Sequence, residues 1–310
     1  MGRLRLIWFG CILIPSLALG QAAHPPTESV TVTGTKSREV LEKFVGSLAT
    51  PARYTGKMAR WGGSICPVTV GVPTAFVTFI NNRLKEIAVQ AGAPVNSSTS
   101  CRPNIAIVFT PRPQALADDI HKRQPALLGY HDNSKQTEKL AIVSHPIQAW
   151  YMTATRDVQG GLQIDNAKPD VLLNRMEFPC PPPMCSDGKI ILYPPRVVTT
   201  TGLRLGDGLR SEFYNIVIVA DRDKLLNYEM GELSDYIAML ALTQLASQDA
   251  CLELPSIANL LVADCAAKSG ALTPTDFAFL RGLYKMGPDM ALGVQKDQVS
   301  YQMERELNGP

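Results

Sequence analysis

The stretch Asn104-Ile105-Ala106-Ile107-Val108-Phe109 decides the fold, because a continuous apolar run of this length is typical of a strand that is buried on both faces of a sheet. Apolar residues recur at the helical period on both sides of it. Residues 73–91 precede the run, with Gly92 and Pro94 ending the pattern, and residues 114–123 follow it. The order of helix, buried strand and helix predicts a sheet that is covered by helices.

The rest of the chain extends this pattern in both directions. Strands are expected in residues 29–33, 140–155, 190–193, 197–205 and 213–220, and the last two are expected to pair as a hairpin across Gly206-Asp207-Gly208. Helices are expected in residues 39–48, 229–245 and 255–267, and in a segment that opens with Thr273 and Pro274. Residues 29–310 are therefore predicted to form a single α+β domain, with helices flanking a mixed or antiparallel sheet.

The N-terminus has the order of a secretory signal peptide. Arg3 and Arg5 are followed by a mostly apolar stretch, residues 6–19, and then by small residues around Gly20. The apolar stretch has about 14 residues, which is short for a membrane span. We predict a signal peptide at residues 1–20, a flexible leader at 21–28 and a soluble protein in the periplasm or outside the cell. A retained membrane anchor is the alternative.

The charge balance argues against nucleic acid as a partner. The chain has 30 Lys plus Arg and 28 Asp plus Glu. Removing residues 1–20 takes away Arg3 and Arg5, which leaves 28 residues of each sign. A neutral protein has no electrostatic footprint for a phosphate backbone. The expected partner is an unidentified envelope or extracellular protein or a small ligand, with no integral membrane span after cleavage.

The cysteines predict disulfides. Seven are present, and Cys11 lies inside the predicted signal peptide, so six remain. An even number in an exported protein is typical of disulfide bonding. Proximity in the sequence favours the pairs Cys66 with Cys101, Cys180 with Cys185, and Cys251 with Cys265, although other connectivities stay open.

No catalytic motif stands out. The histidines are His24, His121, His131 and His145, and His-Glu-x-x-His, the motif of zinc peptidases, is absent from the sequence. No phosphate loop or dinucleotide fingerprint occurs either, so we expect no cofactor and assign no metal ligand.

Two groups of residues are candidate sites. Arg60 and Trp61 in a glycine turn could form a ligand platform, or Trp61 could pack beside Cys66. The second group is a polar cluster of His121, His131 and Asp132, to which Asp118 and Asp119 add carboxylates, and it would suit a hydrolase assembled from distant residues.

Several segments together resemble a family of uncharacterised exported proteins of proteobacteria. They are Arg60-Trp61, Cys66-Pro67, Gly71 with Pro73, and Cys101-Arg102-Pro103-Asn104. This family implies export but no activity.

A weaker likeness is to the zinc peptidases called metzincins, through Leu272-Thr273-Pro274 and Asp276. In those enzymes a preceding helix carries the zinc ligands. Here that helix, residues 229–245, has no histidine, so a shared fold would imply a lost active site.

The sequence therefore predicts a non-catalytic binding or interaction module, with a hydrolase as the alternative. A close approach of His131 or His145 to carboxylates in a deep cleft would favour the hydrolase. A shallow surface with an exposed apolar patch would favour binding.

Overall fold

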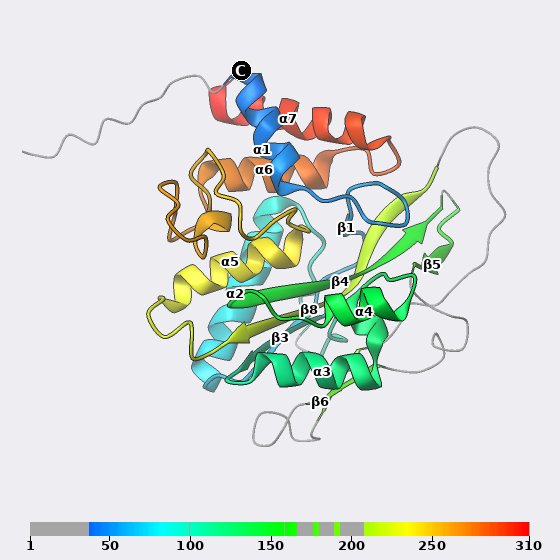
Figure 1. Cartoon of the computed structure of the whole chain (residues 1–310). Helices are drawn as coiled ribbons and strands as arrows, with labels where there is room; N and C mark the ends of the chain where they lie inside the picture. The colour runs from blue at the N-terminus through cyan, green and yellow to red at the C-terminus, as the bar shows by residue number, and fades with distance from the viewer. Residues whose placement is uncertain are drawn as a thin grey trace, which may run out of the picture. The chain divides into compact units, whose positions relative to one another are not determined.

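The computed structural model places a mixed sheet of six strands between two layers of helices (Figure 1). It describes residues 37–98, 100–157, 159–165 and 208–309, and the backbone of 176–179 and 189–192. The strand order is β2-β3-β8-β4-β5, and β1 pairs with the beginning of β8. The strands are β1 Arg60–Trp61, β2 Pro67–Val70, β3 Ile105–Thr110, β4 Ile147–Arg156, β5 Leu162–Ile164 and β8 Arg210–Asp221.

Strand direction changes at β8. The pairs β1–β8, β2–β3 and β3–β8 are parallel. In contrast, β4 is antiparallel to both β8 and β5. The predicted α+β class with helices flanking a mixed sheet is confirmed. The helices are α1 Arg38–Leu48, α2 Thr74–Ala91, α3 Pro113–Arg123, α4 Ser134–Leu140, α5 Met230–Leu242, α6 Pro274–Lys285 and α7 Leu292–Asn308, with 3₁₀ turns η1 Pro125–Leu128 and η2 Ile257–Asn259.

Strand β8 separates two hydrophobic cores. Ile216 and Ile218 pack into the larger core, beneath α1, α2, α5, α6 and α7. Val217 and Val219 point to the opposite face and pack with residues of α3, η1 and α4. Figure 1 shows α3 and α4 on one side of the sheet and α2 and α5 on the other. A strand buried on both faces has no polar side to present, which is why its sequence is continuously apolar.

Two predicted disulfides are present. Cys66, just before β2, bonds Cys101, which lies shortly before β3. Cys251 bonds Cys265 within the segment between α5 and α6. The predicted pair Cys180 and Cys185 lies outside the described residues. So do the predicted signal peptide at 1–20, the leader at 21–28, and the predicted strands at 29–33 and 197–205. The hairpin predicted between 197–205 and 213–220 is wrong, because β8 pairs with β1 and β3 on one edge and with β4 on the other.

The helix predicted at 255–267 is wrong. The structure has only the short turn η2 there. Asn259 explains the difference, because its amide bonds the N–H and C=O of Leu252 and the carbonyls of Leu254 and Ala267. A polar side chain that satisfies the nearby backbone competes with helical hydrogen bonds. The Cys251–Cys265 disulfide closes the same segment.

Two further strands, β6 Met176–Pro179 and β7 Lys189–Leu192, form a separate antiparallel pair. Among the described helices, none is long and apolar enough to cross a membrane.

Candidate functional site

Among the described strands, none pairs with the first half of β4 on the side away from β8, so this stretch is an open sheet edge. β5 pairs only with Ala154–Arg156, at the end of β4. On the side that faces β8, the N–H of Asp221 donates to the carbonyl of Pro146 at 2.7 Å. This bond makes Pro146 and Asp221 a hydrogen-bonded pair, and it therefore fixes which residues of β4 bond to β8. In an antiparallel pair, every second residue turns its N–H and C=O away from the neighbouring strand. In β4 these residues are Ile147, Ala149 and Tyr151.

Neighbouring groups cover two of these three positions. The side-chain amide of Gln248 donates to the carbonyl of Ile147 at 2.8 Å. Gly129, with a φ of +88°, lies against the carbonyl of Tyr151, and a Cβ there would come within 2.6 Å of that oxygen. Among the described residues, no hydrogen bond reaches the outward N–H or C=O of Ala149. The open edge is therefore centred on Ala149.

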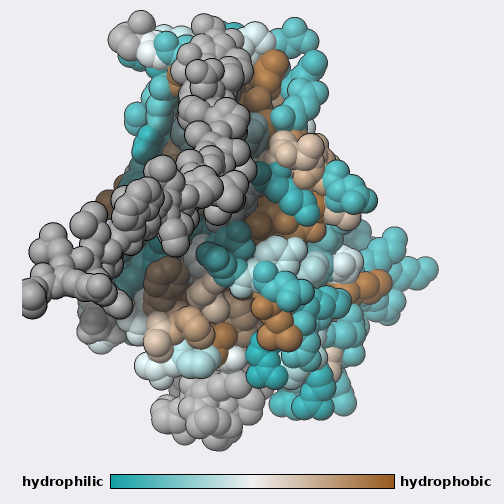
Figure 2. Space-filling view, turned by 90° about the vertical axis from the view of Figure 1, so that its left-hand side faces the viewer, coloured by the Kyte–Doolittle hydropathy of each residue, from teal (hydrophilic) through white to brown (hydrophobic). Residues whose placement is uncertain are grey.

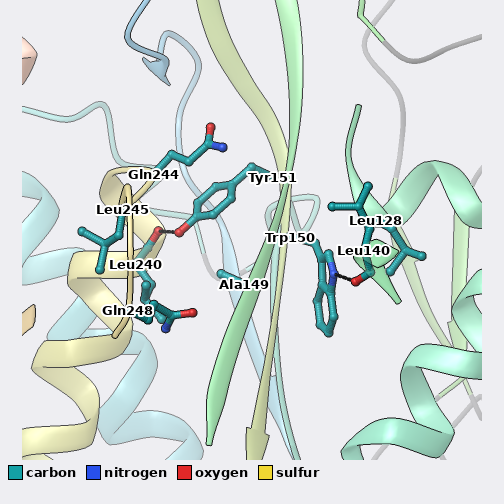
Figure 3. A pocket seen from close by; sticks show the side chains of 9 residues that line it. All are labelled: Leu128, Leu140, Ala149, Trp150, Tyr151, Leu240, Gln244, Leu245 and Gln248. Atoms are coloured by element: carbon teal, nitrogen blue, oxygen red, sulfur yellow. Dashed lines mark hydrogen bonds between the residues drawn. The ribbon is translucent and has the colours of Figure 1, made fainter. Parts of the chain in front are cut away.

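A groove of about 200 Å³ follows this edge, and we call it the β4 groove. Figure 3 shows Trp150 and Tyr151 on opposite sides of β4, so the groove straddles the strand. On the Trp150 side its wall is Leu128 of η1 and Leu140 of α4, and the indole N–H donates to the Leu140 carbonyl at 2.7 Å.

The Tyr151 side of the groove is formed by α5 and the residues that follow it. The Tyr151 hydroxyl donates to the carbonyls of Leu240 and Thr243 at 3.0 and 3.2 Å. Leu245 and Gln244 complete this wall. Burial raises the pKa of Tyr151, so its hydroxyl remains a neutral hydrogen-bond donor.

Gln244 contributes an unusual feature to the groove. Its Oε1 atom is buried and accepts no hydrogen bond in the structure. Most buried polar atoms have a partner, and leaving one without a partner costs about 1–3 kcal/mol. The β4 groove thus offers an N–H and a C=O from Ala149 and an acceptor from Gln244, all without partners among the described residues.

A second cavity, of about 350 Å³, adjoins the beginning of β4 and shares Gln248 with the groove. It contains a chain of hydrogen-bonding groups. Ser144 Oγ lies 2.9 Å from His145 Nδ1, and His145 Nε2 lies 3.1 Å from Asp249 Oδ1. Tyr236 also lines it, and burial raises the pKa of that hydroxyl to about 12. His145 therefore approaches a carboxylate, as the hydrolase alternative requires, but the Asp249 side chain is 83% exposed and does not lie in a deep cleft.

The candidate platform residues lie at the other end of β8. Trp61 is 2% exposed, its ring lies 5.8 Å from that of Phe213, and its indole N–H donates to the Ala241 carbonyl at 2.7 Å. Trp61 thus packs within the fold, and it also lines a cavity together with Arg60. Arg60 Nη1 contacts carbonyls at the end of α6, including that of Tyr284 at 2.5 Å.

The polar cluster is spread over α3 and the loop before α4. Asp119 pairs with Arg123 of its own helix, and Asp118 accepts from Gln114. His121 lies in the last turn of α3, where a cation suits the helix dipole, and His131 Nδ1 lies 2.9 Å from the Gly129 carbonyl.

Asp132, the last member of that cluster, has its own partners. The Tyr130 hydroxyl donates to it at 2.8 Å, which lowers the pKa of the carboxyl group. Arg53 also contacts it at 3.2 Å. Within the described residues, no group of three or more His, Cys, Asp or Glu could hold a metal ion.

Hydrophobic residues elsewhere on the described surface are dispersed. Leu226 and Val89 are 77% and 64% exposed and lie on different elements. On the face that Figure 2 presents, hydrophobic residues stand in small groups among hydrophilic ones. Scattered exposure of this kind is normal for a globular protein. The β4 groove differs because its apolar side chains line a recess.

Sequence reasoning missed most of these residues. Ala149, Gln244, Ser144 and Asp249 carry no motif, and only their meeting at the β4 edge distinguishes them. No sequence signal marked the open edge, because only the structure shows that β5 pairs with three of the ten residues of β4.

The resemblances to the exported family and to metzincins stay predictions. Comparison with protein-family models, with curated proteins and with solved structures found no match to this chain.

Proposed function

We propose that this chain is an exported binding protein whose β4 groove takes an extended peptide segment of a partner protein. The observation that carries the proposal is the open edge at Ala149, between two apolar walls and beside the unpartnered acceptor of Gln244. Strand addition to an open edge is a common mode of peptide recognition, in which the backbone supplies affinity and side-chain pockets supply specificity.

The chemistry of the groove defines its occupant. Ala149 needs both an acceptor and a donor, and Gln244 needs a donor, which is what a peptide backbone presents along one side. Of the three outward-facing residues of β4, only Ala149 has an uncovered N–H and C=O, so the partner segment would form one pair of backbone hydrogen bonds there. None of the described residues that line the groove is charged. The paired segment is therefore expected to be apolar or neutral.

Export is part of this proposal. It is supported by the signal-like order of residues 1–20 and by the two disulfides, because such bonds persist in oxidising compartments. Periplasm and external medium are equally compatible with these features.

Proline at position 149 tests the added strand. The change Ala149→Pro removes an N–H that takes no part in the β4–β8 ladder, and proline is tolerated at strand edges for this reason. We expect the fold to persist and the affinity for a groove-binding peptide to fall about tenfold or more, since one backbone bond is lost and the ring obstructs the partner strand. The probes are peptides selected from a random phage-displayed library on the disulfide-intact protein, measured by fluorescence anisotropy.

Ala149→Ser is the matched control, because serine keeps the N–H at nearly the same size. It should retain affinity within about threefold. Hydrogen exchange gives a second readout, in which bound peptide should slow exchange at Ala149. Equal affinity of the proline and serine variants, with no protection at Ala149, would refute strand addition.

A hydrolase is the second candidate, and the Ser144–His145–Asp249 chain favours it. If Nε2–H donates to Asp249, the lone pair on Nδ1 can accept the Ser144 proton. The serine oxygen would then bond the substrate carbonyl carbon, and His145 would pass the proton to the leaving group. Water would cleave the resulting ester through the same base. Binding takes first place because the Asp249 side chain is 83% exposed, and water weakens its hold on the imidazole.

A fluorophosphonate probe tests the hydrolase. An activated Ser144 should be labelled at a site that mass spectrometry maps to its peptide, and His145→Ala should slow labelling at least a hundredfold, the usual contribution of a general base. Ser98→Ala, at another exposed serine, is the control and should leave the rate unchanged. Labelling that is absent, or indifferent to His145, would exclude this activity.

A further inference from the structure

A cavity of about 220 Å³ lies beside β1 and the beginning of β8, and we call it the Arg210 cavity. Arg60, Arg210, Ser211 and Glu212 are among the residues that line it. Water in the liquid occupies about 30 Å³ per molecule, so the space is that of about seven waters. A small polar ligand with a few waters fits this volume.

Positive charge exceeds negative charge around this cavity. Among the described residues of the lining, Glu212 is the single acidic one, and its side chain is 6% exposed. Arg156 Nε lies 2.8 Å from one of its oxygens, and Arg210 Nε lies 2.8 Å from the other. Arg60 is the third guanidinium group, and burial lowers its pKa. An arginine stays charged even so, because its ordinary pKa is above 12.

The third guanidinium group is held by neutral acceptors. Arg60 Nη1 contacts the carbonyls of Leu283, Tyr284 and Met286 at the end of α6. Those carbonyls carry the negative end of the helix dipole and offset part of its charge. Among the described residues, three guanidinium groups lie near this cavity and one carboxylate offsets their charge. The remaining positive charge gives the cavity a positive potential.

Two donors at the cavity have no hydrogen-bond acceptor among the described residues. The Ser211 hydroxyl belongs to a residue that is 1% exposed, and it has no partner. Arg210 Nε is close to Glu212 but is also without a hydrogen bond, so that contact is ionic and poorly directed. Buried polar groups without partners are rare and call for a ligand or bound water.

The backbone is shaped around this cluster. A Cβ at position 62 would lie 2.2 Å from the carboxyl carbon of Glu212, so only glycine lets that carboxylate take its place between the arginines. Gly62 therefore allows the charges to be assembled here.

We propose that the Arg210 cavity binds a small oxyanion, either a carboxylate or a phosphate group. Oxyanions accept several hydrogen bonds at once and pair with guanidinium groups, which matches the unpartnered donors and the excess positive charge. This site is separate from the β4 groove and does not depend on peptide binding.

Isothermal titration of the disulfide-intact protein with inorganic phosphate and with acetate tests the proposal, at constant ionic strength set with chloride. We expect saturable one-to-one binding of at least one of them. Arg210→Gln should weaken it about tenfold or more, because a charge-assisted bond is lost. Ser211→Ala should weaken it several-fold and should still fold, since the change removes a hydroxyl that has no partner in the free protein.

Arg222→Gln is the matched control, because Arg222 follows the other end of β8 and is 49% exposed. Binding of phosphate but not acetate would identify a phosphate-bearing ligand, and the reverse would identify a carboxylate. Binding of neither anion, or equal losses in the Arg210 and Arg222 variants, would overturn the site. Circular dichroism of each variant excludes misfolding as the cause of a loss.

Discussion

Replacing Asp276 with alanine is expected to lower the free energy of unfolding by about 3–5 kcal/mol. Asp276 is fully buried in the first turn of α6, where it completes a capping box with Thr273. Its carboxylate accepts from the Ser256 hydroxyl at 2.5 Å, from the Ile257 N–H at 3.0 Å, and from the N–H and hydroxyl of Thr273 at 2.8 and 2.9 Å. Alanine would leave these donors buried without an acceptor.

Urea unfolding of the Asp276→Ala variant measures this loss. Asp297→Ala is the control, because Asp297 is an exposed acid on α7 and its removal should change stability by about 0.5 kcal/mol or less. Similar midpoints for the two variants would contradict the assigned role. The result would also show how much the segment between α5 and α6 depends on this one side chain.

The loss at Asp276 should depend on pH. Burial raises the pKa of this carboxyl above its ordinary value of 3.8. An acid with a raised pKa in the folded state stabilises that state below its ordinary pKa, and this contribution is lost as the pH rises through the raised value. The difference between wild type and Asp276→Ala should therefore be larger below pH 3.8 than at pH 7.

Removing the Cys66–Cys101 disulfide is expected to lower the free energy of unfolding by about 4 kcal/mol. The bond joins residues 35 positions apart, and closing a loop of that length restricts the unfolded chain by about this amount. The Cys251–Cys265 bond closes a loop from a separation of 14, so its removal should cost about 3 kcal/mol. Urea unfolding of the paired alanine variants measures both effects.

Reduction of the wild type provides the control for both pairs. With a strong thiol reductant, its midpoint should fall at least as far as that of the Cys66→Ala, Cys101→Ala variant. That variant should itself lose less on reduction than the wild type does. If the unfolding midpoint of the wild type does not change with the reductant, the disulfides contribute nothing to its stability. That result would also weaken the case for an oxidising compartment.

The periodic and apolar segments were predictable because their signals are local. The run 104–109 gave β3, and the pattern of 73–91 gave α2. Thr273 and Pro274 marked the beginning of α6, where the capping box is formed within four residues. The helix predicted at 255–267 failed because the side chain of Asn259 bonds four backbone groups, a competition that no hydrophobic pattern reveals.

The sequence by itself determined the α+β class and the order of the main helices and strands, because these depend on short-range patterns. Proximity along the chain favoured the two disulfide pairs that the structure contains. Tertiary structure alone decided which strand edge stays open and which side chains meet there. Ala149 and Gln244 are 95 positions apart in the chain, and the Arg210 cavity joins β1 to β8 across the 150 positions from Arg60 to Arg210. Contacts between such distant residues depend on how the strands pair, and strand pairing produces no periodic pattern in the sequence.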